Sequence, residues 1–234
     1  MKHSVPTRSP LGQAFTLVEM LVVIAIIGIL AALLFPAFNK VSERGARAKA
    51  RAELQQIEGA IERYHAKYGH YPPDNPGLPA LNQLFYELQG TKIVVLSGIT
   101  NYQTLDSRTN IPVTAVPTSF GSGVGGFVNC TRPGSDDSTT GDAIQFIPTL
   151  TPSRYGFMSN GIGLLTTAVG WPANLGPVKS GAANTLNPFR YNSSSPTHNP
   201  KSYDLWVDIL AGGKTNRISN WNRDFEIAKP VYPE

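Results

Sequence analysis

The sequence predicts an α+β fold, in which a long N-terminal helix packs on a small antiparallel sheet with a loop-rich insertion. Three observations predict it. Residues 15–38 form an apolar run, residues 39–69 continue as an amphipathic helix, and strand-like segments follow between turns. The 22 glycines and 19 prolines among 234 residues exceed the usual share of roughly 12% and indicate many turns.

The run at residues 15–38 contains only one charged residue, Glu19. A helix of about 20 apolar residues can span a bilayer, so we expect a transmembrane helix here. A carboxylate in hydrocarbon costs about 2.5–3.5 kcal/mol, so Glu19 needs a partner there. A secretory signal peptide has a shorter apolar core, and an uncleaved membrane anchor has no need of Glu19.

The helical pattern continues through the amphipathic segment at residues 39–69. Its apolar residues recur at spacings of three and four: Leu54, Ile57, Ile61, Tyr64 and Tyr68. This periodicity predicts a helix with one buried face. Gly69 follows as a stop signal. Within the helix, Gly28 and Pro36 are the predicted kink positions, because glycine weakens a helix and proline removes a backbone donor.

The remaining chain, residues 70–234, is predicted to be one globular domain with an insertion at about residues 97–186. We expect one short helix at residues 78–89. We also expect five strands, at residues 92–96, 143–147, 164–169, 189–191 and 203–210. The insertion is rich in Gly, Ser, Thr, Asn and Pro, which mark loops.

Composition and motifs argue against an enzyme or a nucleic-acid-binding protein. The net charge of +4 is small, and no nucleic-acid partner is expected. Gly213-Lys214-Thr215 lacks the earlier glycine of a phosphate-binding loop, and no Gly-x-Ser-x-Gly motif is present. Cys130, the single cysteine, excludes an internal disulfide and is interpreted as a buried thiol. We predict no catalytic residues.

Aromatic and histidine residues gather where the helix is expected to end. Tyr64, Tyr68 and Tyr71 are interpreted as core packing between helix and sheet. His65 and His70 lack metal-ligand spacing and are interpreted as surface residues.

The stretch Phe15-Thr16-Leu17-Val18-Glu19, followed by the apolar run, resembles the cleavage and methylation signal of the type IV pilin and type II secretion pseudopilin superfamily. The resemblance implies that a prepilin peptidase removes a leader, residues 1–14, by cutting between Ala14 and Phe15. Phe15 would then be N-methylated, and Glu19 would be the fifth mature residue. The family usually has Gly before the cut, where this chain has the next smallest residue, Ala14.

Glu19 has a physical role in such a subunit. Cleavage creates a positive amine on Phe15, and Glu19 can neutralise the amine of a neighbouring copy. This contact would set the stagger of a helical homopolymer, because a heterologous contact that does not close produces a fibre.

Three further stretches resemble the major pseudopilin (protein G type): residues 187–191, residues 203–206 with a downstream Asn220-Trp221, and residues 64–72. The resemblance implies a periplasmic pseudopilus subunit of a type II secretion system. Its implied partners are other pseudopilins, the inner-membrane secretion platform and the lipid bilayer. A type IV or DNA-uptake pilin is one alternative, and a membrane-tethered periplasmic binding domain is another.

The resemblance also sets the predicted location, the bacterial inner membrane with a single span and the C-terminal domain in the periplasm. The positive charges favour the opposite orientation. Lys2 and Arg8 precede the apolar run, whereas five Lys and Arg residues lie within residues 40–51.

Calcium is the one cofactor to consider. Major pseudopilins often hold Ca²⁺ in a C-terminal loop, here residues 208–217, but Asp208 is the only acid in it. Ca²⁺ takes six to eight oxygen ligands, so Asp208 alone makes a poor site, and we predict none. Lys214 and Arg217 can replace the ion by pairing with nearby acids: Asp204, Asp208 or Asp224.

Overall fold

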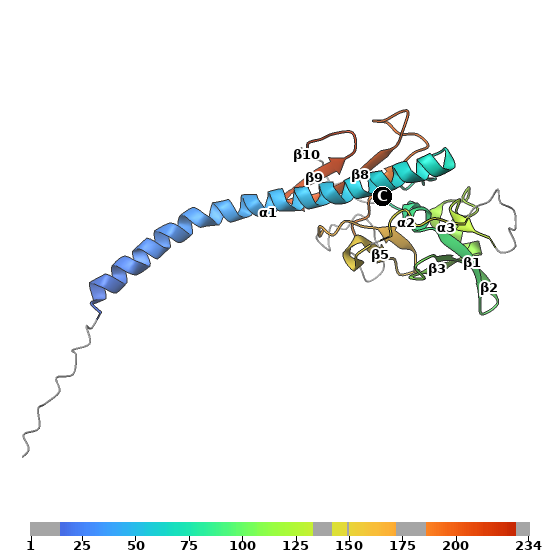
Figure 1. The fold of residues 1–234 in the computed structure, drawn as a ribbon. Coiled ribbons are helices and arrows are strands. Elements are labelled where there is room, and N and C mark those ends of the chain that lie inside the picture. Colours follow the sequence, from blue (N-terminus) through green and yellow to red (C-terminus); the bar gives the residue numbers. More distant parts are fainter. Residues whose placement is uncertain (1–14, 133–141, 149, 172–185, 228–234) are drawn as a thin grey trace, which may run out of the picture. The chain divides into compact units, whose positions relative to one another are not determined.

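The computed structural model describes residues 15–132, 142–148, 150–171 and 186–227, without the side chains of residues 33–39 (Figure 1). The chain divides into two compact units, residues 1–42 and residues 43–234. Helix α1 (Leu17–Tyr68) runs through both of them. The long helix predicted from residue 15 to about Tyr68 is therefore confirmed, and the predicted leader lies outside the described residues.

In the first unit, α1 is uninterrupted at Gly28 and Pro36, so the kinks there remain a prediction. The described part of the chain has no helix with a stretch both long and apolar enough to cross a membrane. The span predicted at residues 15–38 is thus unconfirmed.

In the second unit, one sheet is entirely antiparallel, with strand order β10-β9-β8-β7. Its strands are β7 (Arg190–Asn192), β8 (Asp204–Ala211), β9 (Lys214–Ser219) and β10 (Glu226–Ile227). The strands predicted at residues 189–191 and 203–210 are confirmed to within a residue. Strand β9 was not predicted.

The loop predicted at residues 208–217 is wrong, because this segment is a β-hairpin. Gly212 and Gly213 have φ values of 62° and 70°, which a tight two-residue hairpin turn of the primed type requires. The turn places Asp208 opposite Arg217 in the β8–β9 register.

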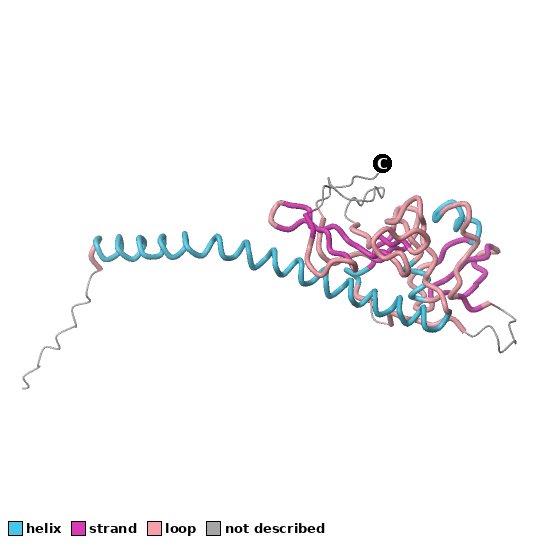
Figure 2. Tube along the Cα trace, turned by 90° about the horizontal axis from the view of Figure 1, so that it is seen from above, coloured by secondary structure: helices cyan, strands magenta, loops and turns pink. Residues whose placement is uncertain are grey.

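A second sheet, of order β3-β2-β1-β4, is formed by β1, which immediately precedes the predicted insertion, and by three strands within the insertion; only β1 and β4 are parallel. Its strands are β1 (Thr91–Leu96), β2 (Ile99–Thr104), β3 (Asn110–Pro112) and β4 (Cys130–Thr131). A separate pair consists of β5 (Tyr155–Phe157) and β6 (Gly163–Leu165). Figure 2 shows how much of the remainder is loop.

Short helices complete this region. They are α2 (Leu84–Gln89), η1 (Val113–Ala115), α3 (Val116–Phe120) and η2 (Pro152–Arg154).

Three predictions in this region need correction. The helix predicted at residues 78–89 begins only at Leu84, because the Asn82 side chain accepts a bond from the Leu84 N–H (3.2 Å) and donates to Pro79 O and Phe189 O. Residues 143–147 form no strand, and Phe146 and Ile147 donate their N–H groups to Leu88 O instead. The strand at residues 164–169 is shorter and ends at Leu165.

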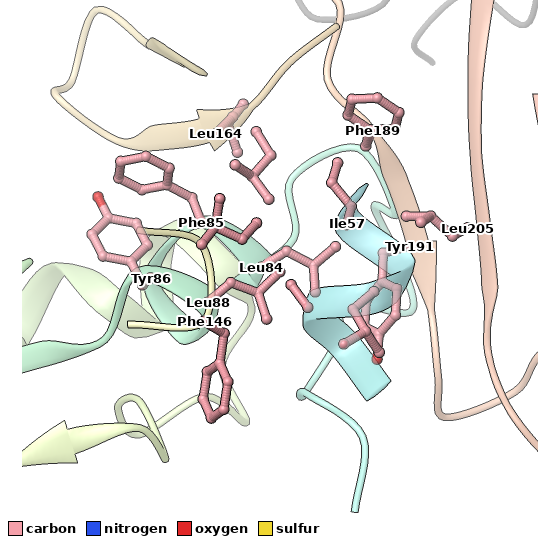
Figure 3. Packing of buried hydrophobic residues seen from close by; sticks show 14 of the residues in the cluster. Ile57, Leu84, Phe85, Tyr86, Leu88, Phe146, Leu164, Phe189, Tyr191 and Leu205 are labelled. Atoms are coloured by element: carbon pink, nitrogen blue, oxygen red, sulfur yellow. The ribbon is translucent and has the colours of Figure 1, made fainter. Parts of the chain in front are cut away.

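The core forms around the second half of α1, which lies between the C-terminal sheet and the insertion (Figures 1 and 3). Leu54, Ile57 and Ile61 have no exposed surface, so the predicted apolar stripe is confirmed. In Figure 3, Ile57 lies between the α2 residues Leu84 and Leu88 and the strand residues Tyr191 and Leu205.

Candidate functional site

The candidate processing site lies at the start of α1, where Thr16 and Glu19 form a reciprocal cap. Glu19 Oε2 accepts bonds from the Thr16 N–H (2.9 Å) and the Thr16 hydroxyl (2.8 Å). In return, Thr16 Oγ1 accepts the Glu19 N–H (3.2 Å). This is a capping box, which satisfies backbone donors that a helix start leaves free. Glu19 therefore has a local partner within its own chain.

The helix beyond this cap presents apolar side chains all round. Phe15 is 72% exposed and Leu17 80% exposed, and the large apolar side chains from Val18 to Leu30 are 44–67% exposed. An exposed apolar surface of this size marks a surface that another apolar phase or molecule covers. Ala14 lies outside the described residues, so cleavage before Phe15 and its methylation remain predictions.

In the C-terminal sheet, Asp208 is paired with Arg217 on the neighbouring strand. Arg217 Nε lies 2.8 Å from Asp208 Oδ1, and Nη2 lies 3.0 Å from Oδ2. Arg190 Nη1 lies 4.0 Å from Oδ2. Hydrogen bonding to Asp208 raises the pKa of Arg217, whereas burial lowers that of Arg190.

The prediction that Arg217 pairs with Asp208 is therefore confirmed. Lys214 is exposed, and Asp204 instead accepts from His198 Nδ1 (3.1 Å). Within the ranges that the structure describes, no group of three His, Cys, Asp or Glu residues could hold a metal ion. Calcium binding remains untested.

A second set of arginine contacts, made by Arg51, was not predicted from the sequence. It lies where α1 meets the end of β9 and the segment that follows. The Arg51 guanidinium donates to the carbonyl oxygens of Ser219 (2.5 Å), Asn222 (2.7 Å), Arg223 (3.0 Å) and Asp224 (3.0 Å). One guanidinium group thus donates hydrogen bonds to all four backbone carbonyl oxygens. The sequence offered no signal for it, because backbone carbonyls have no residue signature.

One turn earlier, Arg47 contacts the same end of the sheet. Its Nε donates to Asn216 Oδ1 (3.0 Å), and its Cζ lies 3.8 Å from the Phe225 ring centroid. These contacts place the Phe225 region beside Arg47.

Two buried carboxylates attach the insertion to the rest of its unit, and both were missed. Glu87 accepts from the backbone N–H of Val128 (2.8 Å), the N–H of Asn129 (2.9 Å) and the Tyr64 hydroxyl (3.1 Å). Burial raises the pKa of Glu87. A signal did exist, because Glu87 is the only charged residue of the segment Leu84–Gln89.

The second carboxylate, Glu53, lies on α1. It accepts from the Thr167 hydroxyl (2.7 Å) and the Ala168 N–H (3.1 Å), and Arg154 Nε lies 3.9 Å away. These polar contacts attach the insertion directly to helix α1.

The other candidate residues have structural surroundings. Burial raises the pKa of Cys130, which opposes thiolate formation and agrees with an inert thiol. Tyr64 is fully buried, and its ring lies 4.6 Å from that of Tyr68. The predicted aromatic packing at the helix end is confirmed. His70 is exposed, and His65 is half-buried and stacks on Tyr71.

Comparison with known proteins matches residues 13–35 to the prokaryotic N-terminal methylation motif. The chain is 39% identical over 69 residues to the type II secretion system core protein G of Escherichia coli (strain K12), covering 30% of this chain and 48% of that protein. It is 36% identical over 66 residues to the type IV major pilin protein PilE1 of Neisseria gonorrhoeae, covering 28% and 31%.

A third relative is a fimbrial protein of Neisseria meningitidis serogroup B (strain ATCC BAA-335 / MC58), 29% identical over 103 residues. That match covers 43% of this chain and 59% of the fimbrial protein. The chain thus spans about half the length of the protein G relatives it matches. No solved structure matches the chain.

The chain therefore matches the N-terminal methylation motif and is similar, over 69 and 66 residues, to a type II secretion core protein G and a type IV major pilin.

Proposed function

We propose that the chain is the precursor of a type II secretion pseudopilus subunit. A prepilin peptidase would hydrolyse the Ala14–Phe15 bond, and a methyl group from a methyl-donor cosubstrate would then replace one proton on the new amine of Phe15. The observation that carries this proposal is the methylation motif at residues 13–35, with Glu19 fifth from Phe15. The exposed apolar helix start is the surface that a bilayer, and then neighbouring subunits, would cover.

The protein's role is structural, and we propose no catalytic activity. The mature chain would cross the inner membrane once through residues 15–38, with residues 43–234 in the periplasm. Its partners would be further copies of itself, the other pseudopilins, the secretion platform and the bilayer.

The capping box refines the proposed role of Glu19. Its Oε2 atom is bonded within the chain, and a carboxylate retains further acceptor positions on its two oxygens. One carboxylate can therefore cap its own helix while its charge offsets the Phe15 amine of a neighbouring copy. The charge, and not the hydrogen bond alone, would then set the subunit stagger.

Two substitutions separate these contributions. Glu19→Gln keeps a hydrogen-bond acceptor at the cap but removes the charge, whereas Thr16→Val removes the hydroxyl of the cap and keeps the charge. We expect Glu19→Gln to reduce filament recovery at least tenfold and Thr16→Val to reduce it less than threefold. Filaments are recovered from cells that overproduce the chain, and the N-terminal mass of each variant reports its processing.

Normal assembly of a correctly processed Glu19→Gln variant would contradict the register role. A wild-type chain that is never recovered as filaments would contradict the whole proposal and would favour a membrane-tethered domain.

A type IV pilin is the second candidate, because the Neisseria relatives are pilins. The discriminating experiment deletes the gene in the source bacterium. Loss of protein secretion with surface fibres retained supports the pseudopilus, and loss of surface fibres with secretion retained supports the pilus.

A further inference from the structure

The β1–β2 hairpin extends beyond the strands that flank it (Figure 1). Strand β4 pairs only with Thr91 and Lys92 of β1, and β3 pairs only with residues 101–103 of β2. Ser97 and Gly98 close the hairpin with φ values of 50° and 79°. Residues 93–100 therefore form a two-stranded tip, and no other strand of the described chain pairs with it.

This hairpin tip is apolar where a free surface is normally polar. Val95 is 67% exposed, Leu96 40% and Ile99 54%, and Leu96 lies directly opposite Ile99. Val95 and Leu96 are neighbours and point to opposite faces of the ribbon. An unprotected strand edge with exposed aliphatic side chains favours association with another chain.

A second exposed apolar patch, the β10 patch, consists of Phe225 and Ile227. Phe225 is 39% exposed and Ile227 67% exposed. Strand β10 lies at the end of its sheet and pairs with β9 through two residues. The patch is therefore also at a sheet edge.

The strands that carry the two patches, the β1–β2 hairpin and β10, lie toward opposite ends of the part of helix α1 that belongs to the second unit (Figure 1). The β10 patch adjoins Arg47, whose guanidinium lies over the Phe225 ring. The base of the hairpin adjoins Tyr68, whose hydroxyl bonds to Asn129 Oδ1 (2.8 Å), the residue before β4. Tyr68 lies 21 positions after Arg47 on α1, which is roughly 32 Å along the axis at 1.5 Å per residue.

A head-to-tail polymer needs two different, complementary patches on one chain. We propose that the hairpin tip (residues 93–100) docks on the β10 patch (Phe225 and Ile227) of a second copy of this chain. Successive copies would then follow one another along the direction of helix α1. This inference rests on the proposed filament function. It assigns to the β1–β2 hairpin and the β10 patch the part of the subunit contact that lies outside the apolar helix.

The test uses the full chain in a strain that assembles filaments. A Leu96→Cys/Ile227→Cys double variant, in a Cys130→Ser background, is oxidised on filaments and analysed without reductant. We expect a ladder of disulfide-linked multimers. Neither single cysteine, nor the control pair Leu78→Cys/Ile227→Cys, should give a ladder; Leu78 is 53% exposed but belongs to neither patch.

A second variant tests the need for the contact. Leu96→Ser/Ile99→Ser should lower filament recovery at least tenfold, and Leu78→Ser should leave it within twofold. Protease resistance of the extracted chain checks folding. If the serine variant misfolds, the cysteine pair carries the test alone.

If the wild-type chain forms filaments but the Leu96→Cys/Ile227→Cys variant gives no ladder, this inference is overturned and the proposed function is left intact. The inference would also be overturned if a folded Leu96→Ser/Ile99→Ser variant gave the same filament recovery as the wild-type chain. Absence of wild-type filaments would be a failure of the proposed function, which the same experiment reveals separately.

Discussion

Arg217 makes a two-bond ion pair with Asp208 across strands β8 and β9, with distances of 2.8 Å and 3.0 Å. The Asp208 carboxylate is almost fully buried and the Arg217 side chain is 22% exposed. The Asp208 carboxylate therefore has little contact with water that could replace a missing partner.

Removing Arg217 should leave a buried carboxylate with only the longer contact to Arg190. Arg217→Ala is expected to lower the free energy of unfolding by about 3 kcal/mol, since breaking a buried pair leaves an uncompensated charge. Lys214→Ala, on the same strand but exposed, should change it by less than about 0.5 kcal/mol. Urea unfolding of the detergent-extracted chain measures both, and equal effects would contradict the assigned role of the pair.

Added calcium should not stabilise this protein. Asp208, the only acid of the segment 208–217, is already bonded to Arg217, and Ca²⁺ would need several further oxygen ligands. We expect the same melting temperature in millimolar CaCl₂ and in EDTA. A saturable rise with calcium, by the linkage between binding and stability, would show that a site exists.

Arg51 should stabilise the segment that follows β9. Its four bonds go to backbone carbonyls at residues 219–224, so substitution leaves several acceptors without a charged donor. Arg51→Ala should cost about 2 kcal/mol and speed amide exchange at residues 219–227. Lys49→Ala, an exposed position on the same helix, is the matched control. Unchanged exchange in Arg51→Ala would contradict this role.

Asp204 should contribute acid-dependent stability. Burial alone would raise the pKa of Asp204, but bonds from His198, Asn199 and Thr197 outweigh it and lower this pKa below its usual value. A carboxyl group with a lowered folded-state pKa stabilises above its unfolded value of about 3.9. This contribution is lost as the pH falls through the folded-state pKa.

The matching measurement is unfolding free energy against pH for Asp204→Asn. The variant should be about 2 kcal/mol less stable than wild type at pH 7, and the difference should shrink as the pH falls below 4. Asp142→Asn, an exposed control, should follow the wild-type curve. A difference that grows toward low pH would contradict the direction of the shift.

The periodic parts of this chain were predictable, and the parts that depend on distant contacts were not. Spacing alone located α1 and its buried stripe, because Leu54, Ile57 and Ile61 recur at helical intervals. Strand β9 was missed because Lys214, Asn216 and Arg217 are polar, and their strand conformation depends on pairing with β8.

The candidate site also contains one contact that local spacing could predict and others that it could not. The order Thr16-x-x-Glu19 contains a capping box that spacing alone could have revealed. The Arg51 contacts, in contrast, join residues about 170 positions apart. No local pattern encodes them.

The central claim is that this chain is processed and assembled as a pseudopilin. The most direct test is the mass of the N-terminal peptide of the protein purified from its own membranes. We predict a peptide that begins at Phe15 and carries one added methyl group. An intact Met1 terminus, or a cut at another position, would contradict the account and indicate a membrane-anchored domain.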